Sequence, residues 1–179
     1  MDKYQWYKVV DGTEQISQGD FLYSCPVIVP VTPIEPETIE QKTVSAKVIE
    51  YDVVIMSQSC DLMFKKLDLV LVCPFWSLDE FEKRNDFFKS KRGKEALRQG
   101  NVPGYHLLNK CDMEGFATTN YLVVDFRNVY GVPFDFLTDL AKRKGIRLRL
   151  LPPYREHLSQ AFARFFMRVG LPIDIPQFK

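Results

Sequence analysis

The chain has 179 residues, of which 46% are hydrophobic and 26% are charged, a balance that is typical of globular proteins and excludes a disordered chain. No apolar run approaches the roughly 18 residues that a membrane-spanning helix needs, and the first eight residues lack the apolar stretch of a secretory signal. We therefore expect a single cytoplasmic domain over residues 1–179 with no membrane contact.

The net charge of +1 conceals two segments of opposite sign. Residues 140–179 contain nine Lys and Arg against two Asp and Glu, a balance of +7, and residues 1–139 have a balance of −6. The basic residues of such a segment either bind an anionic partner or form ion pairs with carboxylates of the same chain. We favour the second interpretation, and the first stays open.

The first predicted strand lies at residues 20–23, behind the turn pair Gln18 and Gly19, and residues 27–31 continue it. Prolines at positions 26, 30, 33 and 36 make it an edge strand or a loop rather than a central strand. Residues 38–46 are polar and predict a long exposed connection.

Two short apolar runs follow, at residues 53–56 and 69–73. Both are rich in β-branched residues, which is typical of buried strands. Further strands are predicted at residues 105–108, 121–126 and 129–132, whereas residues 134–144 stay open between a turn of helix and a loop.

A helical insertion is predicted at about residues 77–100. Ser77 and Glu80 have the spacing of a capping box, and Phe81, Phe87 and Phe88 supply an apolar stripe. Gly93 is expected to divide this insertion into two helices.

The last predicted element is an amphipathic helix at about residues 154–169. Two prolines precede it, Gly170 is suited to end it, and its apolar residues recur at helical spacing. Those residues are Leu158, Phe162, Phe165 and Val169.

The order of these elements resembles the PemK/MazF superfamily of small toxin-like proteins. The matching segments are residues 19–20, 53–57, 69–74, 121–126 and the helix at 154–169. The resemblance implies an α+β fold: a small SH3-like β-barrel with the helical insertion and the C-terminal amphipathic helix added. Many members cut single-stranded RNA, and many act in toxin–antitoxin or defence systems.

One departure from that family bears on function. In RNA-cutting members an Arg-Pro pair commonly leads into the serine-ended strand, and its arginine acts as a catalytic electrophile. Here the corresponding residues are Glu50, Tyr51 and Asp52, and two carboxylates repel an RNA phosphate.

The leading hypothesis is therefore a non-catalytic interaction or regulatory protein of a bacterial toxin–antitoxin or defence system, CRISPR-associated systems included. It would bind a protein partner, and a homodimer is a further expectation. The first alternative is an endoribonuclease in which Arg127, Arg147 or Arg149 replaces the missing arginine, and the second is an RNA-binding module.

The polar corner at residues 57–61 supplies most candidate site residues, because a rigid strand often positions functional groups at its end. Ser57 and Asp61, with Arg127, are the candidate catalytic residues, and Gln58 and Cys60 are candidate binding residues. The alternative is a turn in which Ser57 or Asp61 satisfies backbone amides.

The other candidate binding residues are arginines of the basic segment. Arg147 and Arg149 alternate with apolar residues, which predicts a half-buried strand at 146–151 with a cationic outer face. Such a face suits RNA phosphates or an acidic protein, unless the arginines pair with carboxylates such as Asp125, Asp135 and Asp139. The remaining candidates are Arg155, Arg164 and Arg168.

The four cysteines form no Cys-x-x-Cys pair, so no disulfide framework is expected. Cys25 and Cys73 each precede a proline after an apolar run and are predicted to be buried structural thiols. A zinc set of Cys60, Cys73, Cys111 and His106, or a Cys60–His106 nucleophilic pair, is the less favoured interpretation, and neither a metal nor a cofactor is predicted. His157 is expected to be a partly exposed helix residue rather than a base.

Overall fold

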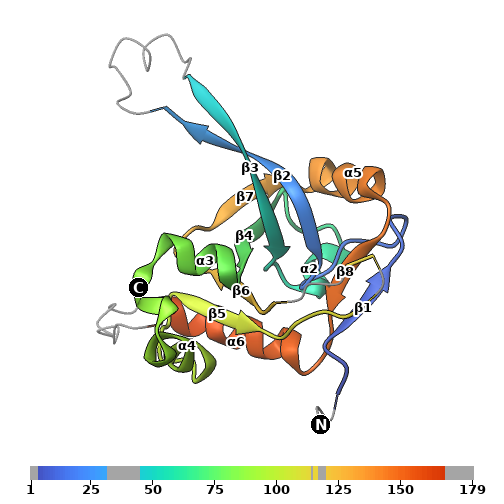
Figure 1. The fold of residues 1–179 in the computed structure, drawn as a ribbon. Coiled ribbons are helices and arrows are strands. Elements are labelled where there is room, and N and C mark those ends of the chain that lie inside the picture. The colour runs from blue at the N-terminus through green and yellow to red at the C-terminus, as the bar shows by residue number, and fades with distance from the viewer. Residues whose placement is uncertain (1–3, 32–44, 114, 117–119, 168–179) are drawn as a thin grey trace, which may run out of the picture.

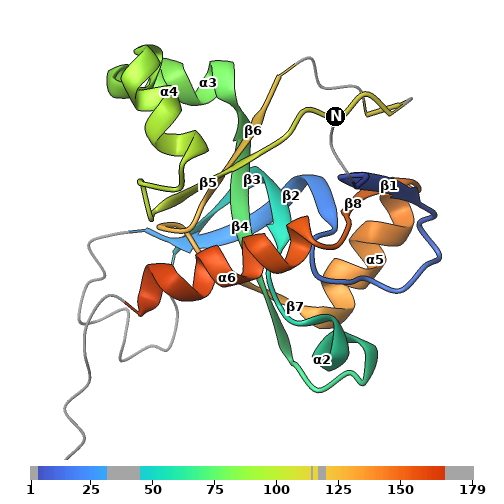
Figure 2. The ribbon, with the colours of Figure 1, turned by 90° about the horizontal axis from the view of Figure 1, so that it is seen from below.

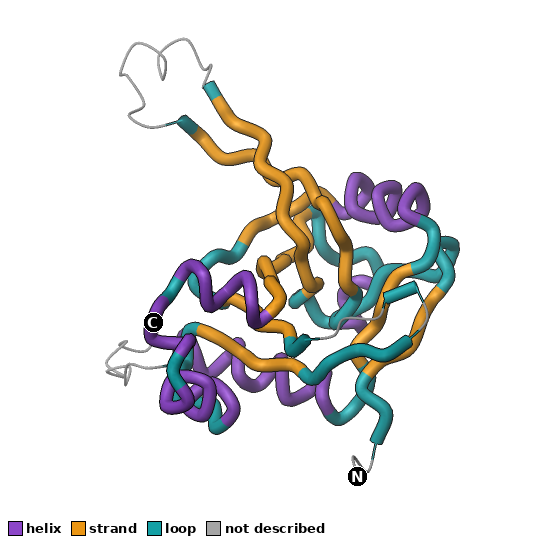
Figure 3. The backbone as a smooth tube through the Cα atoms, in the orientation of Figure 1, coloured by secondary structure: helices purple, strands orange, loops and turns teal. Residues whose placement is uncertain are grey.

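The computed structural model describes residues 4–31, 45–113, 115–116 and 120–167. These residues form eight strands, five α-helices and one short 3-10 helix, which confirms the α+β class (Figures 1 and 3). The strands are β1 (Tyr7–Val10), β2 (Phe21–Pro30), β3 (Ala46–Ile55), β4 (Leu69–Ser77), β5 (Tyr105–Leu108), β6 (Leu122–Asp125), β7 (Tyr130–Pro133) and β8 (Arg147–Leu150). The helices are α2 (Ser59–Met63), α3 (Leu78–Arg84), η1 (Asp86–Lys89), α4 (Lys91–Arg98), α5 (Phe134–Lys144) and α6 (Tyr154–Phe166).

Six strands form one antiparallel sheet in the order β2-β3-β4-β6-β5, with β7 paired to β4. β1 and β8 form a separate antiparallel pair, and an isolated bridge joins Arg149 of β8 to Asp20, the residue directly before β2. Because β5 has no second strand partner among the described residues, the sheet is not a closed barrel, and the predicted SH3-like barrel is not confirmed.

The β2–β3 hairpin extends from the body of the molecule (Figure 1). Its register shifts between Leu22 and Cys25, where Ser24 has a φ of 50° and its backbone N–H donates to the Asp52 carboxylate at 2.9 Å. β2 is an edge strand of the sheet, as its prolines predict. Most of the predicted connection at residues 38–46 lies outside the described residues.

The helical insertion is confirmed, as three short helices rather than two. Ser77 and Glu80 form the predicted capping box at the start of α3. The break falls at η1, and Gly93 lies inside α4, where a Cβ atom would come within 2.1 Å of the Phe87 carbonyl oxygen. Gly93 therefore permits close packing of α4 on η1 and does not end a helix.

α6 lies along one face of the sheet beside β5 (Figure 2). Leu158 is fully buried, and the rings of Phe162 and Phe165 pack against Phe126 at centroid distances of 5.4 and 6.4 Å. Leu158, Phe162 and Phe165 of the predicted apolar stripe are thus confirmed as packing in or against the core, whereas the described helix ends at Phe166 and Val169 lies outside the described residues. Residues 168–179, which include Arg168 and Gly170, lie outside the described residues.

The structure adds three elements that the sequence did not predict or left open: β1, α2 and α5. α5 buries Leu137, Leu140 and Ala141 against β2, β4 and β7 in one of the core clusters. None of the described helices has both the length and the apolar character needed to cross a bilayer.

Candidate functional site

The polar corner after β3 acts as a structural junction. The Ser57 hydroxyl is buried and accepts a hydrogen bond from the Leu71 backbone N–H of β4 at 2.8 Å. Ser57 thus satisfies a backbone amide, as the structural alternative expects, but the amide belongs to a distant strand and not to a local turn. The Gln58 side chain is exposed and donates to the Ser159 hydroxyl of α6 at 3.3 Å. Both residues thus join segments of the fold.

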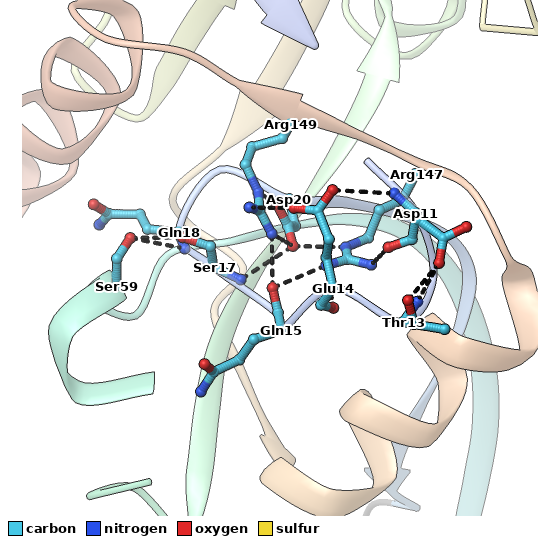
Figure 4. Close-up of polar contacts among 10 residues, drawn as sticks. All are labelled: Asp11, Thr13, Glu14, Gln15, Ser17, Gln18, Asp20, Ser59, Arg147 and Arg149. Atoms are coloured by element: carbon cyan, nitrogen blue, oxygen red, sulfur yellow. Dashed lines mark hydrogen bonds and ion pairs between the residues drawn. The ribbon is translucent and has the colours of Figure 1, made fainter. Parts of the chain in front are cut away.

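The rest of the corner forms the first turn of α2. The hydroxyl groups of Ser59 and Ser17 lie 2.8 Å apart, which joins α2 to the loop between β1 and β2 (Figure 4). Cys60 is exposed, and Asp61 is partly exposed in the first turn of the helix. Figure 2 shows α2 at the opposite end of the sheet from α3.

Arg147 of β8 is the largest fully buried side chain, with 1% of its surface exposed. Its Nε donates to the Asp20 carboxylate at 2.7 Å, and its two terminal nitrogens donate to the backbone carbonyls of Asp11, Glu14 and Gln15 at 2.8 to 3.0 Å (Figure 4). The guanidinium therefore holds the loop between β1 and β2 to β8.

Arg149 completes this arrangement from the same strand. Its Nε and one terminal nitrogen donate to the two oxygens of Asp20, and it also donates to the Gln15 carbonyl at 2.7 Å. We call Asp20, Arg147 and Arg149 the buried ion cluster. Asp20, which is fully buried, accepts hydrogen bonds from both arginines and from the Ser17 backbone N–H.

The prediction that Arg147 and Arg149 form a cationic outer face is wrong. Alternation predicts an exposed face only where one side of a strand meets solvent, and here the β1–β2 loop covers that side. Ion pairing within the fold is confirmed, although the partner is Asp20 and not one of the carboxylates expected. Arg155 pairs with its neighbour Glu156 at 2.6 Å.

A second polar region lies between the insertion and the sheet. It is a cleft of about 340 Å³, which we call the arginine–aromatic cleft. Strands β3 to β7, helix α3 and the segments that follow α3 and β6 contribute to it. Its lining residues are Tyr51, Pro74, Trp76, Phe81, Arg84, Asn85, Tyr105, Asp125, Arg127, Asn128 and Tyr130.

Arg127 has a fixed position in this cleft. The Asp125 carboxylate, which is 2% exposed, accepts hydrogen bonds from the Arg127 backbone N–H at 2.9 Å and from its Nε at 3.2 Å, and also from the Asn128 amide. The guanidinium carbon lies 4.3 Å from the centre of the Tyr105 ring. Hydrogen bonding to Asp125 raises the pKa of Arg127, so this group stays cationic.

Further aromatic surfaces complete the cleft. The Arg84 guanidinium lies 5.1 Å from the centre of the Trp76 ring. Tyr51 and Tyr130 stack at 5.4 Å with an interplanar angle of 17°. Burial, together with a hydrogen bond to Tyr51, raises the pKa of Tyr130 to about 12, so the phenol is neutral at physiological pH.

This lining suits a flat anion. Two guanidiniums against one carboxylate leave a single positive charge in excess, and each guanidinium lies near the face of an aromatic ring. Aromatic faces stack on nucleobases, and guanidinium groups bind phosphates, often in a bidentate manner. The cleft volume lies in the range of small-molecule sites, roughly 300–1,000 Å³.

The candidate catalytic residues do not meet in one cleft. Arg127 lines the arginine–aromatic cleft, as does Tyr51 from the segment where the resemblance places an arginine, whereas Ser57 and Asp61 do not line it. Sequence reasoning identified Arg127 but missed Arg84, Trp76 and Tyr105. Only the position of Trp76 directly before the capping box pointed toward a strand–helix junction.

The cysteines behave largely as predicted. Cys25 and Cys73 are buried, as is Cys111, and burial raises the pKa of Cys73 to about 12. Within the described part of the chain, no three His, Cys, Asp or Glu side chains are grouped so that they could hold a metal ion.

No protein-family model matches the chain, and no match was found among curated proteins.

Proposed function

We propose that the protein binds single-stranded RNA, with one nucleotide unit in the arginine–aromatic cleft. The observation that carries this proposal is the position of Arg127, which Asp125 holds against the Tyr105 ring while over half of the Arg127 side chain stays exposed. A guanidinium held in place and open to solvent is prepared for a phosphate, because little side-chain entropy is lost on binding.

Stacking supplies the second part of the argument. Tyr51, Trp76 and Tyr130 line the same cleft, and a base stacked on an aromatic side chain contributes roughly 1–3 kcal/mol without strong sequence preference. We therefore expect RNA binding with weak base selectivity. This is the RNA-binding alternative among the sequence-based hypotheses, and it needs no catalytic group.

The test is fluorescence anisotropy with a short labelled single-stranded RNA. Replacing Arg84 and Arg127 together by Ala should weaken binding about thirtyfold, if each guanidinium contributes about 1 kcal/mol. The slope of log K against log salt should fall by roughly 1.4, because two phosphate contacts are lost. Arg143→Ala is the matched control, since Arg143 is an exposed arginine of α5 that does not line the cleft.

Two results would overturn the proposal. The first is the absence of saturable RNA binding at low salt. The second is binding that the double substitution at Arg84 and Arg127 leaves unchanged, which would move the RNA to another surface.

A second candidate function is protein binding through an apolar groove. Its volume is about 340 Å³, and it lies between β2, β3, β7 and α5. Ile28 and Val48 line it with 72% and 67% of their surfaces exposed, and Phe136 of α5 completes it. Exposed apolar surface of this kind is found at interaction sites, which supports the leading hypothesis of a protein partner.

Sedimentation of the purified chain over a range of concentrations tests whether that partner is a second copy. Ile28→Lys should abolish any association. A wild-type chain that stays monomeric excludes the homodimer. The assignment to a toxin–antitoxin or defence system stays a prediction based on the family resemblance.

A further inference from the structure

The two histidines of the chain meet in one cleft. His106 of β5 and His157 of α6 both line a space of about 550 Å³ between α4, β5 and α6, which we call the histidine cleft. They are 51 positions apart in the sequence, and only the packing of α6 beside β5 brings them together. The cleft is larger than the arginine–aromatic cleft and is lined by different side chains, apart from Tyr105.

The lining favours an anion. Besides the histidines it contains Arg98, Arg164 and two glutamine amides, and no carboxylate is among the described residues that line it. Arg98 pairs with Glu95 at 2.6 Å, so part of its charge is neutralised. Arg164 is exposed and forms no ion pair among the described residues.

The surroundings of His106 disfavour its charged form, and a bound anion would stabilise that form. Its ring stacks on Phe126 at 6.2 Å with an interplanar angle of 23°, and it is only partly exposed. Burial, followed by the neighbouring His157, lowers the pKa of His106 to about 4. The groups that line the cleft around it are Arg98, Tyr105, His157 and Arg164, and none of them supplies a negative charge at neutral pH.

The histidine cleft adjoins the arginine–aromatic cleft at one residue. Tyr105 lines both of them, at the start of the edge strand β5. Gly104, the preceding residue, lies between the Arg127 side chain and the Phe165 ring of α6, so that a Cβ atom there would come within 3.1 and 3.7 Å of them. A single RNA strand that runs around the start of β5 would contact both clefts.

We propose that the histidine cleft binds a phosphate group, supplied by the next phosphodiester of the RNA strand that the arginine–aromatic cleft holds. Arg164 and His157 are the principal donors, and a bound anion favours the protonated form of His106. The RNA part of this inference rests on the proposed function, whereas affinity for phosphate itself does not.

Proton NMR of the two histidine rings tests the inference, because the chain has only two such residues and a variant assigns each signal. With inorganic phosphate added, at an ionic strength matched by sodium chloride, the titration midpoint of His106 should move to higher pH. Replacing Arg164 and His157 together by Gln should raise the dissociation constant for phosphate, read from the His106 signal, about tenfold or more, since charge-assisted hydrogen bonds are lost. Arg143→Ala should leave the response unchanged.

The same spectra with a short single-stranded RNA identify the source of the phosphate. Both histidine signals should respond to RNA, and the double substitution of Arg84 and Arg127 by Ala should weaken the response to RNA but not to inorganic phosphate. A response to phosphate alone would refute the RNA part and point to a free phosphate or nucleotide. RNA binding that leaves both histidine signals unmoved, with no response to phosphate, would overturn the inference while the proposed function stands.

Discussion

Replacing Asp20 by Ala should destabilise the protein severely. The carboxylate accepts hydrogen bonds from Arg147, Arg149 and the Ser17 backbone N–H, and its removal leaves the Arg147 guanidinium, 1% exposed, without a counter-charge. Breaking a buried ion pair in this way costs about 3–5 kcal/mol. Arg149 adds less to this cost, because it keeps an ion pair with Glu14 at 3.4 Å and 12% of its side chain is exposed.

Urea unfolding followed by circular dichroism measures this loss. With a slope of about 2 kcal/mol per molar urea, the midpoint should fall by about 2 M. Arg143→Ala removes an exposed arginine, and its free energy of unfolding should stay within about 0.5 kcal/mol of that of the parent protein. If Asp20→Ala gives no soluble folded protein, Asp20→Asn, which keeps the shape and one acceptor oxygen, should show an intermediate loss.

A loss below about 1 kcal/mol for Asp20→Ala would refute the reasoning, because that is the size expected of a surface ion pair. Asp20→Asn that unfolds at the parental midpoint would show that hydrogen-bond geometry, and not charge, holds the β1–β2 loop.

Other predictions follow from local contacts. The pKa of His106 in the folded protein, about 4, lies below its unfolded value near 6.5, so the unfolded state binds more protons between these limits. The contribution of His106 to stability should therefore be constant above about pH 6.5 and fall by about 1–3 kcal/mol as the pH drops to 4, and His106→Gln should flatten this part of the profile. In a thiol assay of the folded protein, exposed Cys60 should react quickly and buried Cys73 only after unfolding; equal rates would contradict the burial of Cys73. Ser77→Ala removes the capping box that it forms with Glu80 and should cost about 1 kcal/mol by thermal unfolding, whereas Ser77→Asp should retain most of the stability.

Much of the secondary structure was predictable from the sequence, because local chemistry determines it. The β-branched runs at 53–56 and 69–73 lie within β3 and β4, and Ser77 and Glu80 begin α3 as their spacing indicates. β1 was missed because Tyr7–Val10 is only four residues long and includes the charged Lys8, although the turn pair Asp11-Gly12 follows it. It is a strand only because β8, far along the chain, pairs with it.

The candidate sites were less predictable, because each depends on segments that only the tertiary fold brings together. Tyr51, Tyr105 and Arg127 lie on separate strands or loops and meet at the end of the sheet. The same is true of His106 and His157. Conversely, the alternation around Arg147 suggested a surface because a sequence pattern does not show that a loop covers the outer side of a strand.

The pairing of β1 with β8 also determines how late in its synthesis on a ribosome the protein can finish folding. Asp20 leaves the ribosome early, and Arg147 is not synthesised until 127 residues later. Until then the carboxylate has no guanidinium partner, and Tyr7 waits for Leu150 to form its strand pair. Because such distant pairings form slowly, assembly of these two strands is a late event in biosynthesis, after the central hairpins have formed.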